Sequence, residues 1–395
     1  MRNVYIVDGV RTPIGRFGRS LKDYTAVDLA TFVIRKLLER TNVNPSDVEF
    51  VVMGHVIRAG TGMNTARQAA LRAGIPGSVD AMNVDMVCAS GMAAIITGAM
   101  YIAAGAYDLV VAGGMESMSN APFIIPSSYR WGVRHFILGK GRGEILDSMV
   151  YDGLLDPLLG YVMGEEADLI ARKYEAPREE LDWIAFESHM RAARAWKLGL
   201  MRRYVEPFTV NGKVILEQDE GIRFDLKIDD LKLLQPVFTR EGPHTVATSS
   251  QLSDGAAVVL LASDNAIKRL GLEPKARVVG YSYVGLEPQE FPVAPVYAIR
   301  RLLERVGWSI DKVDFWENNE AFAVNSFIVN KMLGIPYDRL NVHGGAIAVG
   351  HPLGASGARI TIELINVLEV NKGLRGVASI CHGLGGAAAI ALELV

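Results

Sequence analysis

The sequence contains very little cysteine. Cys88 and Cys381 are the two in the chain of 395 residues. A disulfide framework needs more cysteines than this, and two distant cysteines without paired spacing do not form a structural zinc site. A redox pair between the two remains an alternative. We expect free thiols, a cytoplasmic location and no bound metal.

The sequence also lacks a charge excess of either sign. Its net charge is −3, so it has no overall basic field to attract nucleic acid or an anionic membrane. A long run without charged side chains extends from Met86 to Tyr107, but Ala, Gly and Ser dominate it and acidic residues bracket it. We predict a buried helix there and not a membrane span. The first residues lack the apolar segment and cleavage site of a signal peptide.

Hydrophobic residues, by contrast, are plentiful, at 50% of the chain. The length suggests two or three domains. Apolar strand-like segments alternate with helical patterns in the first third of the chain. Strands are predicted at 4–9, 48–56, 81–87 and 108–113, and helices at 27–40, 64–73 and 89–104. This alternation predicts an α/β fold with a mostly parallel sheet.

The texture of the sequence changes after residue 118. Charged and aromatic residues become more frequent, two helices are predicted within 165–200, and apolar strand patterns resume from Thr248. We predict a domain inserted into the first of two halves. The predicted N-terminal half is 1–118 plus 247–268, the inserted loop domain is 119–246, and the C-terminal half is 269–395.

An internal repeat supports the two halves. Seven identities share an offset of 265, namely Arg35, Leu37, Leu38, Glu39, Arg40, Val48 and Phe50 with Arg300, Leu302, Leu303, Glu304, Arg305, Val313 and Phe315. The segment Ala89-Ser90-Gly91 recurs as Ala355-Ser356-Gly357 at an offset of 266. Two similar halves packed face to face bring equivalent loops together. The loops before these two segments carry Cys88 and His351.

Both of these residues can take part in nucleophilic chemistry. A cysteine between a strand and a helix receives backbone N–H groups and the helix dipole, which predict a lowered thiol pKa and a nucleophile. A histidine in a glycine-rich turn can accept the thiol proton or hydrogen-bond an oxyanion. The alternatives are a cysteine that packs as a small hydrophobe and a histidine that is only structural.

Four further segments carry candidate residues. Cys381 follows an apolar strand and precedes a glycine-rich turn, where its thiol can transfer a proton. Asn319 can hold a water or an oxyanion, or it can be the N-cap of the helix that follows. Ser250 can contact a ligand or belong to a turn. A basic stretch in the insertion can meet phosphates or form a solvated loop, and it comprises Arg130, Arg134, Lys140 and Arg142.

Four segments resemble the motif set of the thiolases. They are VCASGM around Cys88, NEAFA at Asn319, GGAIAVGHPLGASG around His351 and CHGLGG at Cys381, in the same order and spacing. The resemblance extends over essentially the whole chain. It implies the five-layered αβαβα fold, with two similar halves and a loop domain inserted in the first.

The resemblance also implies roles for individual residues. Cys88 matches the acyl-accepting nucleophile, and His351 the residue that activates it. Cys381 matches the acid/base that handles the substrate α-proton and the leaving group. His351 and a water held by Asn319 match one oxyanion hole, and the N–H groups of Cys88 and Gly383 match the other. Two reactive thiols and two such holes suit a reaction that both transfers an acyl group and makes or breaks a carbon–carbon bond.

The resemblance further implies that coenzyme A binds to the loop domain as a substrate and is not a permanently bound cofactor. Arg223, Ser250 and Met163 match family positions near it, and the family forms dimers and tetramers. Val162 stands where short-chain biosynthetic members usually carry histidine, and Leu384 where many members have glycine. We predict a 3-ketoacyl-CoA thiolase of fatty acid metabolism that can also act on acetoacetyl-CoA. The alternatives are a decarboxylating ketosynthase-type enzyme and a non-catalytic acyl-CoA carrier or assembly subunit.

Overall fold

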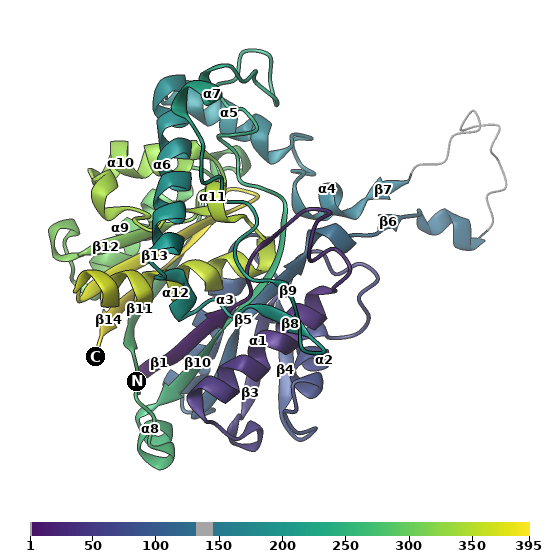
Figure 1. Ribbon diagram of the computed structural model, residues 1–395, viewed down its shortest axis with the longest axis vertical. Helices are drawn as coiled ribbons and strands as arrows, with labels where there is room; N and C mark the ends of the chain where they lie inside the picture. The colour runs from purple at the N-terminus through teal and green to yellow at the C-terminus, as the bar shows by residue number, and fades with distance from the viewer. Residues whose placement is uncertain (1, 132–144) are drawn as a thin grey trace.

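A single mixed sheet runs through the molecule. The computed structural model describes residues 2–131 and 145–395 (Figure 1). Ten strands form the sheet, in the order β12-β13-β14-β11-β1-β10-β5-β3-β4, with β2 paired to β10. They are β1 (Val4–Arg11), β2 (Gly15–Arg16), β3 (Phe50–Gly54), β4 (Asp80–Val84), β5 (Leu109–Ser117), β10 (Ser253–Ser263), β11 (Ala276–Gly285), β12 (Phe315–Asn318), β13 (Arg375–His382) and β14 (Gly386–Leu394).

The directions of these strands correct one expectation. The parallel pairs are β3–β4, β3–β5 and β12–β13, whereas the pairs that join β1, β10, β11 and β14 to their neighbours are antiparallel. The prediction of a mostly parallel sheet was therefore wrong. Strands such as β10 are buried along their whole length. A strand buried on both faces reads as a continuous apolar run whatever its direction, so the sequence pattern did not distinguish the two arrangements.

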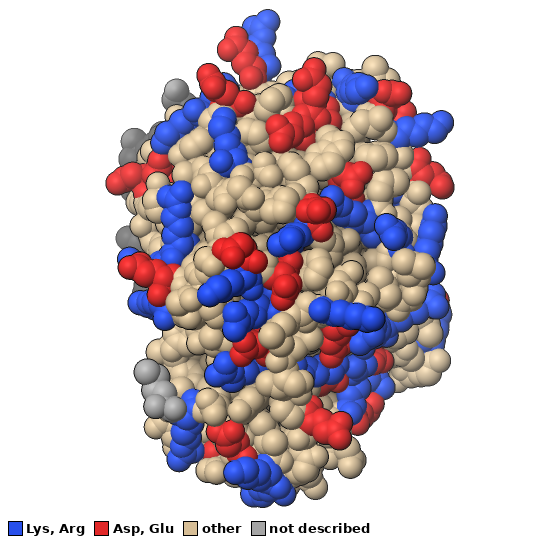
Figure 2. Space-filling model, turned by 90° about the vertical axis from the view of Figure 1, so that its left-hand side faces the viewer, with Lys and Arg blue, Asp and Glu red and all other residues tan. Residues whose placement is uncertain are grey.

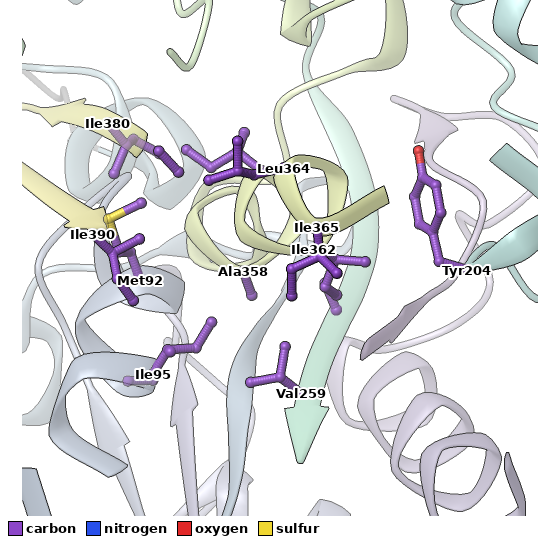
Figure 3. Close-up of a cluster of buried hydrophobic side chains, with 14 of the residues drawn as sticks. Met92, Ile95, Tyr204, Val259, Ala358, Ile362, Leu364, Ile365, Ile380 and Ile390 are labelled. Atoms are coloured by element: carbon purple, nitrogen blue, oxygen red, sulfur yellow. The ribbon is translucent and has the colours of Figure 1, made fainter. Parts of the chain in front are cut away.

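The helices complete five layers. Helices α1 (Ala26–Thr41) and α2 (Thr65–Arg72) pack with the N-terminal strands in one core, and α9 (Ala294–Val306) and α10 (Ala323–Leu333) pack with the C-terminal strands in another. The central core holds α3 (Ser90–Ala103) and α12 (Leu353–Asn371) with strands from both halves. Figure 3 shows α12 between Ile380 and Ile390 on one side and Val259 on the other. This is the five-layered α/β architecture that the motifs imply.

Local sequence explains where several of these helices begin and end. Thr25 and Asp28 form a capping box before α1, and Asn42 ends this helix in the left-handed region. Gly307 and Gly334 end α9 and α10 in the same conformation, which costs glycine little. Helix α3 lies within the long uncharged run and is largely buried. Among the described residues, no helix is long and apolar enough to cross a membrane.

The segment between β5 and β10 packs over both halves. Its regular elements are β6 (Phe123–Ile124), β7 (Leu146–Asp147), α4 (Ser148–Gly153), α5 (Met163–Lys173), α6 (Arg178–Lys197), β8 (Phe208–Val210), β9 (Lys213–Leu216) and α7 (Ile228–Lys232). A fully buried, bidentate ion pair joins this segment to β1, because Arg11 donates to both oxygens of Asp219 at 2.6 and 2.8 Å. Elsewhere lie α8 (Asp264–Leu270) and α11 (Ala346–Val349). The predicted domain boundaries stay predictions.

Charge is mixed over the molecular face in Figure 2, where lysines and arginines alternate with acidic residues. This agrees with the small net charge of the sequence. Of the predicted basic stretch, Arg134, Lys140 and Arg142 lie outside the described residues.

Candidate active site

A cavity of about 260 Å³ gathers the predicted reactive residues. Cys88, His351, Cys381 and Gly383 all line it, although they come from both halves of the chain. The rest of its wall is mainly apolar and includes Met118, Leu154, Val162, Met163, Phe238, Leu252, Phe291, Phe322 and Leu353. A largely apolar cavity with a few convergent polar groups is the usual form of a small-molecule site.

Cys88 lies in a tight turn between β4 and α3. The preceding residue, Val87, has a φ of 45°, which is rare for a β-branched side chain and indicates local strain. Two hydrogen bonds of Ser90 hold the turn: its hydroxyl donates to Val87 O at 2.6 Å and accepts from Met86 N–H at 2.8 Å. Helix α3 begins at Ser90. The turn therefore fixes the thiol just before the first turn of the helix.

Burial raises the pKa of the Cys88 thiol to about 12, and the Glu116 carboxylate acts in the same direction. The backbone N–H groups of Gly383 and of Cys88 itself hydrogen-bond to the sulfur and oppose this effect. The prediction that the helix N-terminus lowers this pKa was wrong for the free enzyme, because removing a thiolate from water outweighs the donors around it. The same two N–H groups are those predicted to form an oxyanion hole.

His351 precedes α12 and is held in one orientation. Its Nδ1 lies 2.6 Å from Ser356 Oγ, which donates its own proton to Pro352 O at 2.9 Å. Ser356 must then accept from Nδ1–H, so Nε2 carries the free lone pair. Nε2 is buried and has no hydrogen-bond partner within the described ranges. Burial and the nearby Arg359 lower the pKa of His351 to about 3, so the imidazole is neutral and able to accept a proton.

Cys381 lies near the end of β13 and is almost fully buried. Burial raises the pKa of its thiol well above the usual value, and the neighbouring Cys88 adds to the shift. Asn325, on the first turn of α10, donates from Nδ2 to the Cys381 sulfur at 3.4 Å. This hydrogen bond lowers the pKa of the thiol and so opposes the effect of burial. Sequence reasoning missed Asn325. Its place six residues after Asn319 in the same motif region was the available signal.

Asn319 follows β12, is fully buried and is not among the residues that line the cavity. Its backbone N–H donates to Ser379 O at 2.9 Å, and its side-chain oxygen accepts from Arg359 Nη2 at 3.2 Å. Its Nδ2 has no partner in the part of the chain that the structure describes. The N-cap alternative was wrong, because α10 begins at Ala323 after Phe322.

Glu116 was also missed, and it ties the two halves together at the site. Its carboxylate comes from β5 and accepts from the N–H of Gly354 at 3.0 Å, in the first turn of α12. It also accepts from the N–H groups of Val56 and Ile57 at 3.2 Å each. An anion at the N-terminus of a helix is favourable. Glu116 therefore helps to place the helix that follows His351.

Of the three residues predicted to contact coenzyme A, two line the cavity and one does not. Ser250 and Met163 line the cavity. Arg223 is exposed and does not line it, and its backbone N–H donates to Nδ1 of His189 at 3.1 Å. Among the described residues, no group of three or more His, Cys, Asp or Glu side chains is placed to hold a metal ion.

Comparisons with known proteins agree over the full length. Residues 4–265 match the family model described as thiolase, N-terminal domain, and residues 272–394 match that of the C-terminal domain. The chain is 42% identical to an acetyl-CoA acetyltransferase of Synechocystis sp., with 100% of both proteins covered. It is 40% identical to a probable acetyl-CoA acyltransferase of Staphylococcus epidermidis, covering 98% of this chain and 97% of the relative.

Two solved structures are similar throughout. An acetyl-CoA acetyltransferase of Bacillus anthracis superposes with a TM-score of 0.96 at 40% identity, over 100% of this chain and 99% of the other. A protein of Ascaris suum in complex with coenzyme A gives a TM-score of 0.93 at 39% identity, with both chains fully covered.

Proposed function

The chain belongs to the thiolase family, and we propose that it cleaves 3-ketoacyl-CoA with coenzyme A, or runs the reverse condensation of acetyl-CoA, through an acyl group on Cys88. The observation that carries this proposal is the convergence of Cys88, His351 and Cys381 on one apolar cavity. The relatives are named acetyl-CoA acetyltransferases and acyltransferases. This family membership favours thiolase chemistry over the ketosynthase and carrier alternatives.

In the first step, Cys88 gives its proton to Nε2 of His351 as its sulfur attacks the 3-keto carbon of the substrate. The neutral histidine and the raised thiol pKa keep both groups uncharged before substrate arrives. The tetrahedral oxyanion lies on the carbon bonded to the Cys88 sulfur, so the N–H groups of Cys88 and Gly383 are within reach to stabilise it.

In the second step, the bond between C2 and C3 breaks and leaves the enolate of acetyl-CoA. The enolate oxygen is the thioester oxygen, which the protonated His351 and the Asn319 side-chain amide, through a water, are placed to stabilise. The Cys381 thiol protonates C2 and releases acetyl-CoA. Its thiolate then takes the proton of an incoming coenzyme A thiol, whose sulfur attacks the acyl group on Cys88. The bond from the acyl carbon to the Cys88 sulfur breaks, and Cys88 recovers its proton from His351.

The test measures loss of acetoacetyl-CoA and of a longer 3-ketoacyl-CoA in the presence of coenzyme A. We expect cleavage that Cys88→Ala abolishes, and acetylated Cys88 in Cys381→Ala treated with acetyl-CoA. The ratio of the two rates determines the chain-length preference, which we propose includes chains longer than acetoacetyl because the cavity wall is apolar. A folded wild-type protein that cleaves neither compound would overturn the proposal.

We further propose that coenzyme A reaches Cys88 past Met163 and Ser250, with Arg223 outside the cavity near its phosphates. Substitution of Arg223 by Gln should then raise the KM for coenzyme A without changing kcat. A homodimer or homotetramer in the cytoplasm, acting in fatty acid metabolism, completes the proposal. Light scattering of the purified protein measures the assembly directly.

A further inference from the structure

Helix α12 carries a stripe of polar side chains through the centre of the molecule. Residues Leu353 to Leu368 are all buried, yet Ser356, Arg359, Glu363 and Asn366 interrupt the apolar sequence. Their spacings of three and four residues place them on one face of the helix. Buried polar side chains are costly unless they are paired or functional. Ser356, at one end of the stripe, already holds His351.

Arg359 is the next residue on this stripe and has an incomplete set of partners. Its side chain is buried, and its Nη2 donates to Asn319 Oδ1 at 3.2 Å. Its Nε and Nη1 have no hydrogen-bond partners among residues 2–131 and 145–395. Burial lowers the pKa of its guanidinium, and the carboxylates of Glu317 and Glu363 act against that shift. The structure therefore holds a buried cation in contact with the side chain of Asn319.

An arginine can only donate hydrogen bonds, so it determines which way the amide of Asn319 faces. The acceptor oxygen of Asn319 must point to Arg359, and the donor Nδ2 must point away. That Nδ2 and the Nε2 of His351 are both buried and unpartnered within the described chain. With the amide reversed, the oxygen would compete with the enolate for the protons of the bridging water. The orientation thus decides whether Asn319 can help to stabilise an anion.

We propose that Arg359 is a positioning residue for the carbon–carbon step, because it fixes the Asn319 amide with its N–H₂ group directed to the water that stabilises the enolate oxygen. This inference rests on the proposed function. Arg359 acts through Asn319 and not on the substrate. Acylation of Cys88 uses the N–H groups of Cys88 and Gly383, so it does not depend on this contact.

The experiment compares two reactions of the same enzyme. Thiolysis of acetoacetyl-CoA includes the carbon–carbon step, whereas exchange of labelled coenzyme A into acetyl-CoA proceeds through acetyl-Cys88 without it. In Arg359→Lys the charge stays but the flat two-donor head is lost. We expect thiolysis kcat to fall about tenfold to a hundredfold, below the loss for removing an oxyanion donor outright. Exchange should stay within about twofold of wild type.

A double-mutant cycle separates positioning from a general structural effect. In an Asn319→Ala background, Arg359→Lys should cause little further loss of thiolysis, because the amide that it orients is gone. Arg11→Lys is the matched control: it also replaces a buried arginine without changing charge, and Arg11 binds Asp219 and not Asn319. Its ratio of thiolysis to exchange should equal that of wild type.

Equal losses in thiolysis and exchange, or a full additional loss in the Asn319→Ala background, would overturn the inference. So would unchanged thiolysis in Arg359→Lys. A wild-type enzyme inactive in both assays would instead overturn the proposed function. If Arg359→Lys does not fold, Arg359→Met removes the buried charge together with its donors, and the same selective loss of thiolysis is expected.

Discussion

Gly91 and Gly357 lie where α3 crosses α12, and each leaves room for the other helix. A Cβ on Gly357 would lie 2.4 Å from the backbone nitrogen of Met92, and a Cβ on Gly91 would lie 2.9 Å from that of Ala358. The two glycines are the third residues of the repeated Ala-Ser-Gly segments. The repeat therefore marks a place where the two halves approach closely, beside Cys88 and His351.

Adding a methyl group at this crossing should destabilise the protein. We expect Gly357→Ala to lower the free energy of unfolding by about 1–3 kcal/mol, because the helices must separate to admit it. Urea denaturation measures the change. Gly77→Ala is the control, since no atom of the described residues lies within 4 Å of a Cβ at that position. Equal stability of the two variants would show that the crossing is not tightly packed.

The reactivity of Cys88 should depend steeply on pH. A thiol whose pKa is raised to about 12 is almost entirely protonated at neutral pH. Alkylation of the free enzyme by iodoacetamide should therefore accelerate about tenfold per pH unit from 7 to 9. Mass spectrometry of the Cys88 peptide, separately from the Cys381 peptide, gives the rate. A plateau below pH 8 would indicate a thiolate paired with a protonated His351 and would contradict the neutral resting pair.

Asn325 should matter for the carbon–carbon step through Cys381. We expect Asn325→Ala to slow thiolysis of acetoacetyl-CoA about tenfold or more, because the Cys381 thiolate loses its side-chain donor. Asn330→Ala is the control on the same helix, because it loses a bond from Nδ2 to Ile335 O at 2.9 Å and does not face the sulfur. Each variant should lose about 1 kcal/mol of stability. Similar thiolysis rates in both would remove Asn325 from the mechanism.

The free energy of unfolding should depend on pH because His189 is buried and neutral in the folded protein. Burial lowers its pKa to about 4, and the positive charge of Arg223 adds to this. The unfolded chain binds a proton at this position near pH 6.5, so His189 makes the folded state lose stability as the pH falls from 6.5 towards 4. Between pH 7.5 and 5.5 the loss is about 1.4 kcal/mol for this one group.

Substitution of His189 by Gln should remove this component, while the amide oxygen still accepts from Arg223 N–H. Urea unfolding of both proteins at pH 7.5 and 5.5 gives the difference. Wild type should lose about 1.4 kcal/mol more than the variant over this interval. If the two proteins show the same pH dependence, His189 titrates normally in the folded state.

Leu384 offers a test of backbone strain in the turn after Cys381. Its φ is 65°, in the left-handed region, and its side chain is partly exposed. Asparagine adopts this conformation more readily than leucine does. It also gives the unfolded chain less backbone freedom than glycine would. We expect Leu384→Asn to raise the free energy of unfolding by about 1 kcal/mol. A loss of stability would mean that the Leu384 side chain contributes more packing than its conformation costs.

Several elements could be predicted because their signals are local. The helix at 27–40, the apolar strand of β5 and the glycine-rich turns at His351 and Cys381 lie within short stretches of sequence. The repeat indicated that Cys88 and His351 approach each other, and the structure places both in one cavity. The strand directions and the role of Arg359 had no such signal. The polar spacing along α12 was visible, but it acquires meaning only once that helix is known to be buried.

By itself, the sequence determined the family and predicted the reactive groups and the two-half organisation, because these depend on residue type, order and spacing. The tertiary structure decided the charge state of those groups. The pKa of Cys88 rises and that of His351 falls because both are enclosed by segments hundreds of residues away in sequence. Desolvation depends on every atom that surrounds a group, and no local pattern records it. The same holds for the Asn319 amide, whose direction is set by a helix from the end of the chain.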